Sequence, residues 1–156
     1  MKMKELACVL VFLVVVLAGV YSFAVEKNKY GFYEPSPNEV MFGTWINTKN
    51  SGGAGKPQKI VSHPWGAYDI YMLATNKTPD YRGSRIIVDK WSDAKENTWY
   101  KIYNREDWTT MAIWALERVN KDGKFKEYVW SHQDFPSEDD LNSKNPIAHY
   151  GIMDRQ

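Results

Sequence analysis

The feature that most constrains the fold of this chain is a series of short apolar runs separated by clusters of turn residues. The runs are rich in β-branched and aromatic residues, which favour β-strands. Separators such as His63-Pro64-Trp65-Gly66 and Asn120-Lys121-Asp122-Gly123 are typical of tight hairpin connections. The runs cover residues 40–46, 58–62, 67–73, 84–91, 97–103, 109–119, 125–130 and 147–153. This spacing predicts an all-β domain, a single antiparallel up-and-down barrel of about eight strands. A β-sandwich is the alternative interpretation.

Alternation within the runs indicates that both faces of the sheet carry apolar residues. Tyr68, Ile70 and Met72, for example, share one face of their run. This pattern favours a sheet closed around a core, with aromatic residues left over for the outside. In the run 84–91, strict alternation places Ile86, Val88 and Lys90 on one face, and Arg85, Ile87, Asp89 and Trp91 on the other.

The first 24 residues have the order of a secretory signal peptide. A short basic start precedes an almost unbroken apolar run over residues 6–20, and Ser22-Phe23-Ala24 places small residues before a cleavage site. We therefore expect an exported protein, periplasmic or secreted. The alternative is an uncleaved membrane anchor, because an apolar stretch of roughly 20 residues can span a bilayer. Val20 stands where a lipoprotein would carry its acylated cysteine, so lipid attachment is not expected.

We expect three parts in the chain: a signal peptide over residues 1–24, a polar leader over residues 25–39, and one barrel domain over residues 40–156. The only cysteine, Cys8, lies in the signal peptide, so the exported domain depends on its core and not on disulfides. The whole chain has 20 basic and 19 acidic residues, of which two lysines and one glutamate lie in the signal peptide. The rest of the chain therefore has 18 basic and 18 acidic residues. This neutral domain has no overall field to draw it to nucleic acid or to an anionic membrane.

The longest connection, residues 133–146, contains the start signals of a short helix. Pro136-Ser137-Glu138-Asp139-Asp140-Leu141 combines a capping serine with acidic residues in the first turn. Three consecutive carboxylates lack the alternating ligands and glycine pivot of a calcium loop. We therefore interpret them as a solvated helix start and not as a metal site.

Several short motifs resemble the lipocalin-like, or calycin, barrels, in particular small exported bacterial members of that superfamily. Gly43-Thr44-Trp45 is similar to the Gly-x-Trp opening of their first strand. The resemblance implies that Trp45 closes one end of the barrel and packs against Arg155. The other matching pieces are Phe42, Tyr81-Arg82-Gly83, Trp99-Tyr100-Lys101-Ile102, Glu127-Tyr128-Val129-Trp130-Ser131 and Arg155-Gln156.

The sequence offers no recognisable catalytic or metal-binding motif. His63, His132 and His149 share no ligand spacing. Nucleophile elbows, phosphate loops and zinc-protease motifs are missing from the sequence. We therefore expect a non-enzymatic protein without a cofactor. An enzyme would instead need a carboxylate or histidine with a perturbed pKa in a cleft.

The enriched feature with functional potential is the aromatic content, because seven tryptophans all follow residue 24. An eight-stranded barrel either is filled by its side chains or holds one small ligand. The first hypothesis is a small apolar or amphipathic ligand inside the barrel, with a lining chosen by alternation: Tyr68, Ile70, Met72, Tyr100, Ile102, Trp114 and Tyr150. The second is a filled barrel that binds an envelope protein or glycan through surface aromatics, with Trp65, Trp108 and Trp130 on one face.

Overall fold

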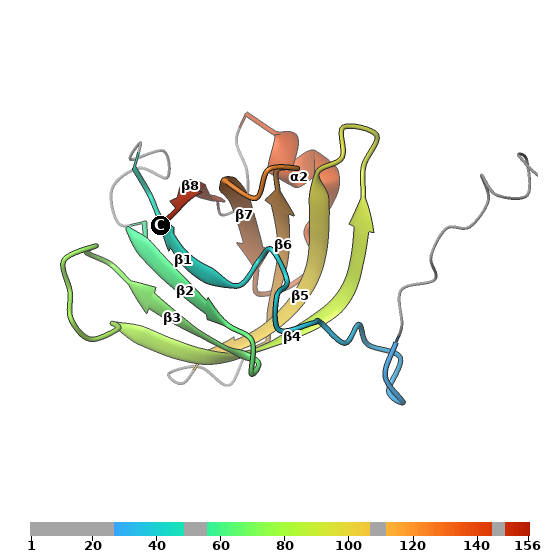
Figure 1. Cartoon of the computed structure of the whole chain (residues 1–156), viewed down its shortest axis with the longest axis horizontal. Coiled ribbons are helices and arrows are strands. Elements are labelled where there is room, and N and C mark those ends of the chain that lie inside the picture. Colours follow the sequence, from blue (N-terminus) through green and yellow to red (C-terminus); the bar gives the residue numbers. More distant parts are fainter. Residues whose placement is uncertain (1–26, 49–55, 107–111, 145–148) are drawn as a thin grey trace, which may run out of the picture.

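Eight antiparallel strands follow one another in chain order around a closed barrel, within the residues that the computed structural model describes, 27–48, 56–106, 112–144 and 149–156 (Figure 1). The strands are β1 (Gly43–Ile46), β2 (Lys59–His63), β3 (Ala67–Tyr71), β4 (Tyr81–Ser92), β5 (Thr98–Glu106), β6 (Ile113–Val119), β7 (Phe125–Ser131) and β8 (His149–Arg155). The predicted up-and-down barrel is confirmed. The sandwich alternative is wrong, because one hydrogen-bonded ring holds all of these strands.

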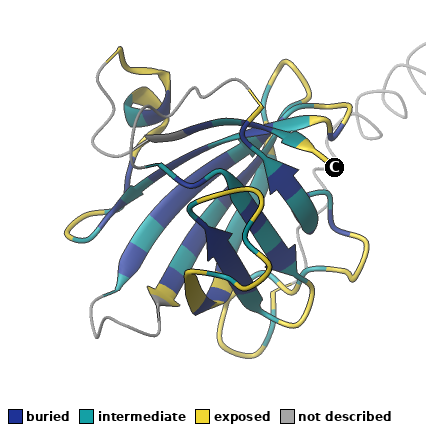
Figure 2. Ribbon diagram, turned by 90° about the vertical axis from the view of Figure 1, so that its left-hand side faces the viewer, coloured by how far each residue is buried: buried dark blue, intermediate teal, exposed yellow. Residues whose placement is uncertain are grey.

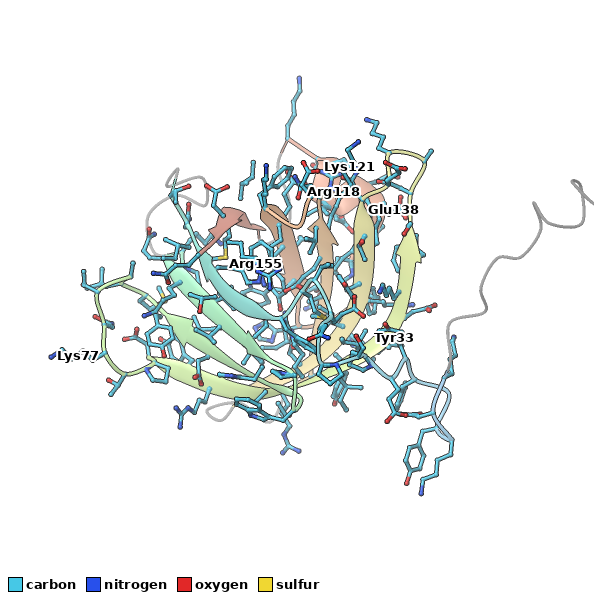
Figure 3. All side chains as sticks on the ribbon, viewed as in Figure 1. Tyr33, Lys77, Arg118, Lys121, Glu138 and Arg155 are labelled. Carbon is cyan, nitrogen blue, oxygen red and sulfur yellow. The ribbon has the colours of Figure 1, made fainter. Side chains whose placement is uncertain are left out.

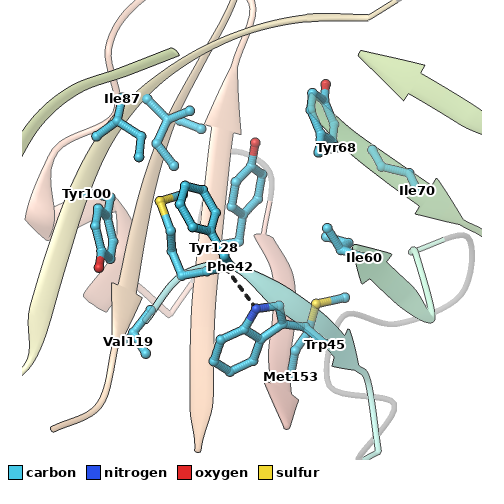
Figure 4. Close-up of a cluster of buried hydrophobic side chains, with 13 residues drawn as sticks. Phe42, Trp45, Ile60, Tyr68, Ile70, Ile87, Tyr100, Val119, Tyr128 and Met153 are labelled. Atoms are coloured by element: carbon cyan, nitrogen blue, oxygen red, sulfur yellow. Dashed lines mark hydrogen bonds between the residues drawn. The ribbon is translucent and has the colours of Figure 1, made fainter. Parts of the chain in front are cut away.

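Inward side chains from all around the barrel form the main core. Part of this core, around Phe42 and Trp45, is shown in Figure 4. The alternation of inward and outward residues gives the strands their bands of buried and half-buried colour in Figure 2, whereas many connections are exposed. The buried members are Met41, Phe42, Trp45, Ile60, Tyr68, Ile70, Ile87, Tyr100, Ile102, Ala115, Val119, Tyr128 and Met153.

A β-bulge in β4 changes which of its residues face inward. The register between β4 and β5 shifts at Val88, so the residues beyond it exchange faces. Lys90 points inward, with its Nζ 5.8 Å from the ring centre of Tyr100. Trp91 points outward and stacks on Trp99, with ring centroids 5.9 Å apart. Strict alternation assigned Lys90 and Trp91 to the opposite faces and is wrong beyond the bulge.

The predicted short helix is present as α2 (Glu138–Asn142). It covers part of the outer face of the sheet. The Ser137 side chain accepts a hydrogen bond from the backbone N–H of Asp140, whose carboxylate accepts one from the backbone N–H of Ser137. This capping box fixes the start of the helix. The buried Leu141 then packs into a second apolar cluster outside the barrel, formed by Trp99, Leu116, Val129 and Leu141 with Trp91 and Phe135 beside them.

The seam between the first and the last strand is built around Trp45. Its side chain is fully buried, and its indole Nε1 donates to the Met41 carbonyl at 3.0 Å (Figure 4). Lys126 Nζ lies 5.1 Å from the ring centre of Trp45, and the Arg155 guanidinium lies 5.9 Å from it. Gly43 has a φ of +119°, and an added Cβ would lie 3.5 Å from Arg155 Nε. The positive φ favours glycine at this position, whereas an added Cβ would only come into ordinary contact with the guanidinium.

The N-terminal segment, residues 27–42, covers a part of β4 that β3 does not reach. β4 has 12 residues and β3 has five, so β4 extends beyond its partner. The Tyr33 backbone N–H donates to β4, and Figure 3 shows Tyr33 where this segment meets the barrel. Buried Glu39 accepts hydrogen bonds from Lys90 Nζ at 2.7 Å and from Tyr100 at 2.6 Å. Burial by itself raises the pKa of Glu39, but these donors outweigh it and hold the pKa below its ordinary value.

We expect Trp45→Ala to lower the free energy of unfolding by about 3–5 kcal/mol, because truncation of a large buried aromatic side chain leaves a cavity. Denaturant unfolding measures this change. Trp65→Ala is the matched control, since it removes an exposed ring and should change stability by no more than about 0.5 kcal/mol. An unchanged midpoint for Trp45→Ala would contradict its place in the core.

We expect Arg155→Ala to destabilise the protein by about 1 kcal/mol, through loss of the cation–π contact with Trp45. The same substitution in the Trp45→Ala background should have a smaller effect, because the contact is already gone. A double-mutant cycle tests this, and equal effects in the two backgrounds would show that the residues are not coupled.

Candidate functional site

Five of the predicted lining residues lie together inside the barrel. Tyr68, Ile70, Tyr100 and Ile102 belong to the main core, and none is more than 2% exposed. Met72 is half-buried and packs against the same cluster. Their burial shows that this part of the interior is densely occupied by side chains.

Trp114 lies outside the barrel, so its assignment to the lining is corrected. It alternates with the inward Ala115 on β6 and packs against Phe135, with ring centroids 5.4 Å apart, and edge-on against Tyr103. The run 109–119 is apolar on both faces, so alternation alone did not indicate which face is inward. The side chain of Tyr150 lies outside the described part of the structure.

A cluster of buried charges shares the interior with these residues. Arg85, Glu117 and Lys126 are each no more than 4% exposed. The Arg85 guanidinium donates to Glu117, to Ser62 Oγ at 2.5 Å and to Asn104 Oδ1 at 3.4 Å. Lys126 Nζ donates to the same Glu117 oxygen at 3.3 Å. The interior is therefore more polar than the apolar lining that alternation suggested.

Burial and the neighbouring charges act in opposite directions on the pKa values of Glu117 and Lys126. Burial by itself raises the pKa of Glu117, but Arg85 and Lys126 outweigh it and lower the pKa. For Lys126 the burial dominates and lowers the pKa to about 8. Two cations thus share one carboxylate, whose Oε2 has no hydrogen-bond partner among the described residues. Buried charges remain stable only when paired in this way.

The most exposed large apolar side chain of the described residues is Trp65, in the hairpin between β2 and β3. It is 73% exposed and stacks on His63, with ring centroids 4.2 Å apart. Asp69 Oδ2 lies 3.1 Å from His63 Nε2, and this hydrogen bond fixes the orientation of the imidazole. Gly66 has a φ of +83°, and an added Cβ would lie 3.3 Å from the Arg85 carbonyl. The turn therefore presents the indole in a defined position, with one face on His63.

A first groove, of about 480 Å³, lies beside Trp65 on the outer face of β3 and β4. Its walls include Asp69, Arg82 and Ser84. Arg82 Nε donates to Asp69 Oδ1 at 2.9 Å, and its two Nη groups make no hydrogen bond in the described part of the chain. The guanidinium fork and the carboxylate provide donors and acceptors for a polar ligand.

A second groove, of about 340 Å³, lies on the other side of the same hairpin, between it and the N-terminal segment. Its walls combine apolar side chains with polar groups, several of them from the N-terminal segment. The side chains of Pro35, Phe42, Pro64, Ile86, Asn28 and Tyr33 contribute to it. His63, Trp65 and Gly66 line both grooves, so the two meet at the hairpin.

The predicted patch of Trp65, Trp108 and Trp130 needs correction. Connections alternate between the ends of an up-and-down barrel, so the β2–β3 hairpin and the end of β7 lie at opposite ends. Trp130 therefore lies far from Trp65, and it packs against the main core and edge-on against His132. Trp108 lies outside the described residues. The local signal for Trp65 was its place in a tight Pro-Trp-Gly turn, where no neighbouring strand can cover it.

Within the described part of the chain, the remaining candidates do not form a second site. His63 and His132 lie at opposite ends of the barrel, and the side chain of His149 is outside the described part. Among the described residues, no group of three His, Cys, Asp or Glu side chains is arranged to hold a metal ion. No helix within the described ranges has the length and apolar character needed to cross a membrane.

The chain matches no family model, no curated protein and no solved structure. The structure itself defines the class: an all-β protein with one closed antiparallel barrel of eight strands in its described part, compatible with a lipocalin-like fold. The Trp65 hairpin and its two grooves form the candidate functional site.

We expect the free energy of unfolding to rise between about pH 8 and pH 10 through Lys126. Burial lowers its pKa to about 8 in the folded protein, whereas an exposed lysine titrates near pH 10.4. The unfolded chain therefore binds more protons in this window, which makes stability increase with pH. A difference of two pH units corresponds to about 3 kcal/mol.

Chemical denaturation across this pH window measures the effect, with Lys126→Met as the control of similar length and no charge. The rise should be absent from Lys126→Met. The same slope in both proteins would show that Lys126 is not its source.

Proposed function

We propose that the protein is a non-enzymatic binding protein that holds a glycan at the Trp65 hairpin. The observation that carries this proposal is the exposed Trp65 ring, held on His63 between two grooves. The C–H bonds on a sugar ring face carry partial positive charge, which the negative face of an indole attracts. Asp69 and Arg82 lie beside the ring and supply acceptors and donors for hydroxyl groups. Such a combination of aromatic surface and few polar groups is typical of small-ligand sites.

The shape of the site favours a glycan over a folded protein partner. A stable protein interface buries about 1,200–2,000 Å² and is centred on several packed anchor residues. At this hairpin one exposed indole stands between grooves of 480 and 340 Å³, which suit sugar units. Binding of this kind uses only side chains of the chain itself and needs no cofactor.

We also infer that the barrel is a lipocalin-like one and that the protein is exported. The contact between Trp45 and Arg155, together with Gly43, supports the first inference. The basic, apolar and small-residue order of residues 1–24 supports the second. An exported protein would meet glycans of the cell envelope or the surroundings by diffusion.

We expect isothermal titration with a panel of neutral oligosaccharides to find a ligand whose affinity falls roughly tenfold or more in Trp65→Ala, because the loss of stacking removes more than about 1.4 kcal/mol. Leu73→Ala is the matched control. Leu73 is 59% exposed, in the connection at the opposite end of the barrel, so its truncation should not alter the affinity. Binding to no member of the panel, or equal binding by Trp65→Ala, would overturn the glycan proposal.

A small amphipathic ligand inside the barrel is the second candidate function. The observation in its favour is the mixed character of the interior, where Ile70 and Ile102 lie in the same core as Tyr68 and Tyr100. Glu117 Oε2, which lacks a partner among the described residues, is an acceptor that a ligand donor would satisfy. This site would use the lining predicted from the sequence, apart from Trp114.

Native mass spectrometry before and after organic extraction tests this second candidate. A small molecule that copurifies and is lost on extraction would place a ligand in the barrel. The mass of the bare chain, with no shift on addition of fatty acids, would show that the interior takes none of these molecules.

A further inference from the structure

We infer that the glycan is a chain of N-acetylated sugar units that crosses the Trp65 hairpin and occupies both grooves at once. This inference rests on the proposed function and names its ligand more closely. It follows from three observations: the two grooves share residues, their walls are lined by different residues, and neither lining has an excess of cations.

The two grooves are parts of one binding surface. Trp65, His63 and Gly66 line both of them, so a ligand that leaves one groove along the indole enters the other. Each volume lies within the roughly 300–1,000 Å³ of small-ligand sites, so each groove holds at least one ring. A single sugar cannot fill both. A linked chain, with one unit stacked on Trp65, makes use of the whole surface.

The second groove fits an acetamido group better than a plain hydroxyl. Pro35, Pro64 and Ile86 give it apolar walls, on which the methyl of an acetyl group loses contact with water. Asn28 Oδ1 already accepts from the backbone N–H groups of Tyr30 and Phe32, so its Nδ2 can donate to the acetyl carbonyl. The Glu34 carboxylate in the same groove can accept from the amide N–H. Ile86 is 42% exposed, so its apolar surface is available to a ligand without any change in the core.

The first groove fits the hydroxyl groups of a neighbouring unit. Arg82 Nε donates to Asp69, while its two Nη groups make no hydrogen bond to the described residues, and Ser84 adds a hydroxyl. The Asp69–Arg82 ion pair makes this wall neutral overall. The second groove is lined by one cation, Arg85, which is paired with Glu117 inside the barrel, and by one carboxylate, Glu34. A neutral chain therefore matches the surface, and a polyanion finds no excess cation to bind.

Isothermal titration with two series of oligosaccharides tests the inference. N-acetylglucosamine oligomers of one to six units carry the acetamido group, and cello-oligosaccharides of the same lengths have a hydroxyl in its place. We expect affinity in the acetylated series to rise at least tenfold from one unit to three or four and then to level off. The cello-oligosaccharides should bind at least tenfold more weakly at equal length.

Variants of the two grooves distinguish the parts of the inference. Ile86→Ser should reduce the preference for the acetylated series, while Arg82→Ala should weaken both series and leave the preference in place. Leu73→Ala should change neither, and circular dichroism verifies that each variant is folded. Because these side chains lie outside the core, the substitutions report on binding and not on folding.

Each outcome separates this inference from the proposed function. Equal affinity for both series, lost in Trp65→Ala, would overturn the acetamido assignment and leave glycan binding intact. Equal affinity for one unit and for long chains would overturn the occupation of both grooves. Binding of neither series would overturn the inference, and the failure of every other neutral glycan would overturn the proposed function as well.

Discussion

The packing of Trp45 between two cations is the interaction on which the closed barrel depends. β1 has four residues and meets β8 in two register pairs, so backbone pairing alone contributes little to the seam. The indole fills this place, with Lys126 on the inside and Arg155 from the last strand. Because Arg155 lies on β8 and Trp45 on β1, their contact joins the first and the last strand of the ring. Closure is thus a long-range event that one aromatic side chain makes favourable.

A barrel this small must also stabilise the charged side chains that point into it. Arg85, Glu117 and Lys126 lie inside the barrel because every second residue of a strand points inward, whether it is charged or apolar. They are stable there only as a mutually paired group. Pairing fixes the side chains and fills the space that a large apolar ligand would occupy. The same arrangement explains why the candidate site lies on the outside. Core side chains and charge pairs occupy much of the interior, whereas the two grooves at the Trp65 hairpin are open to solvent.

The sequence was sufficient for the architecture and insufficient for the site. Strands and the α2 helix could be predicted because their signals are local: alternation, turn residues and the Ser137–Asp140 capping box. The bulge at Val88 could not, since it depends on the register between two strands and reverses the faces of every later residue in β4. From the sequence alone, Trp65 and Trp130 are equivalent candidates for an exposed aromatic patch. Only the order of strands around the ring shows that they lie at opposite ends.

An exposed tryptophan held in a fixed position is costly to a small domain, because its apolar surface stays in contact with water. In this chain a stack on His63, a hydrogen bond between His63 and Asp69 and a left-handed Gly66 all keep the Trp65 ring in place. A ring that merely failed to find a place in the core would need none of these supports. Preorganisation has a benefit only at the moment of binding, when it removes the entropy lost in ordering a flexible side chain. The rigidity of the hairpin is therefore itself an argument that Trp65 meets a ligand.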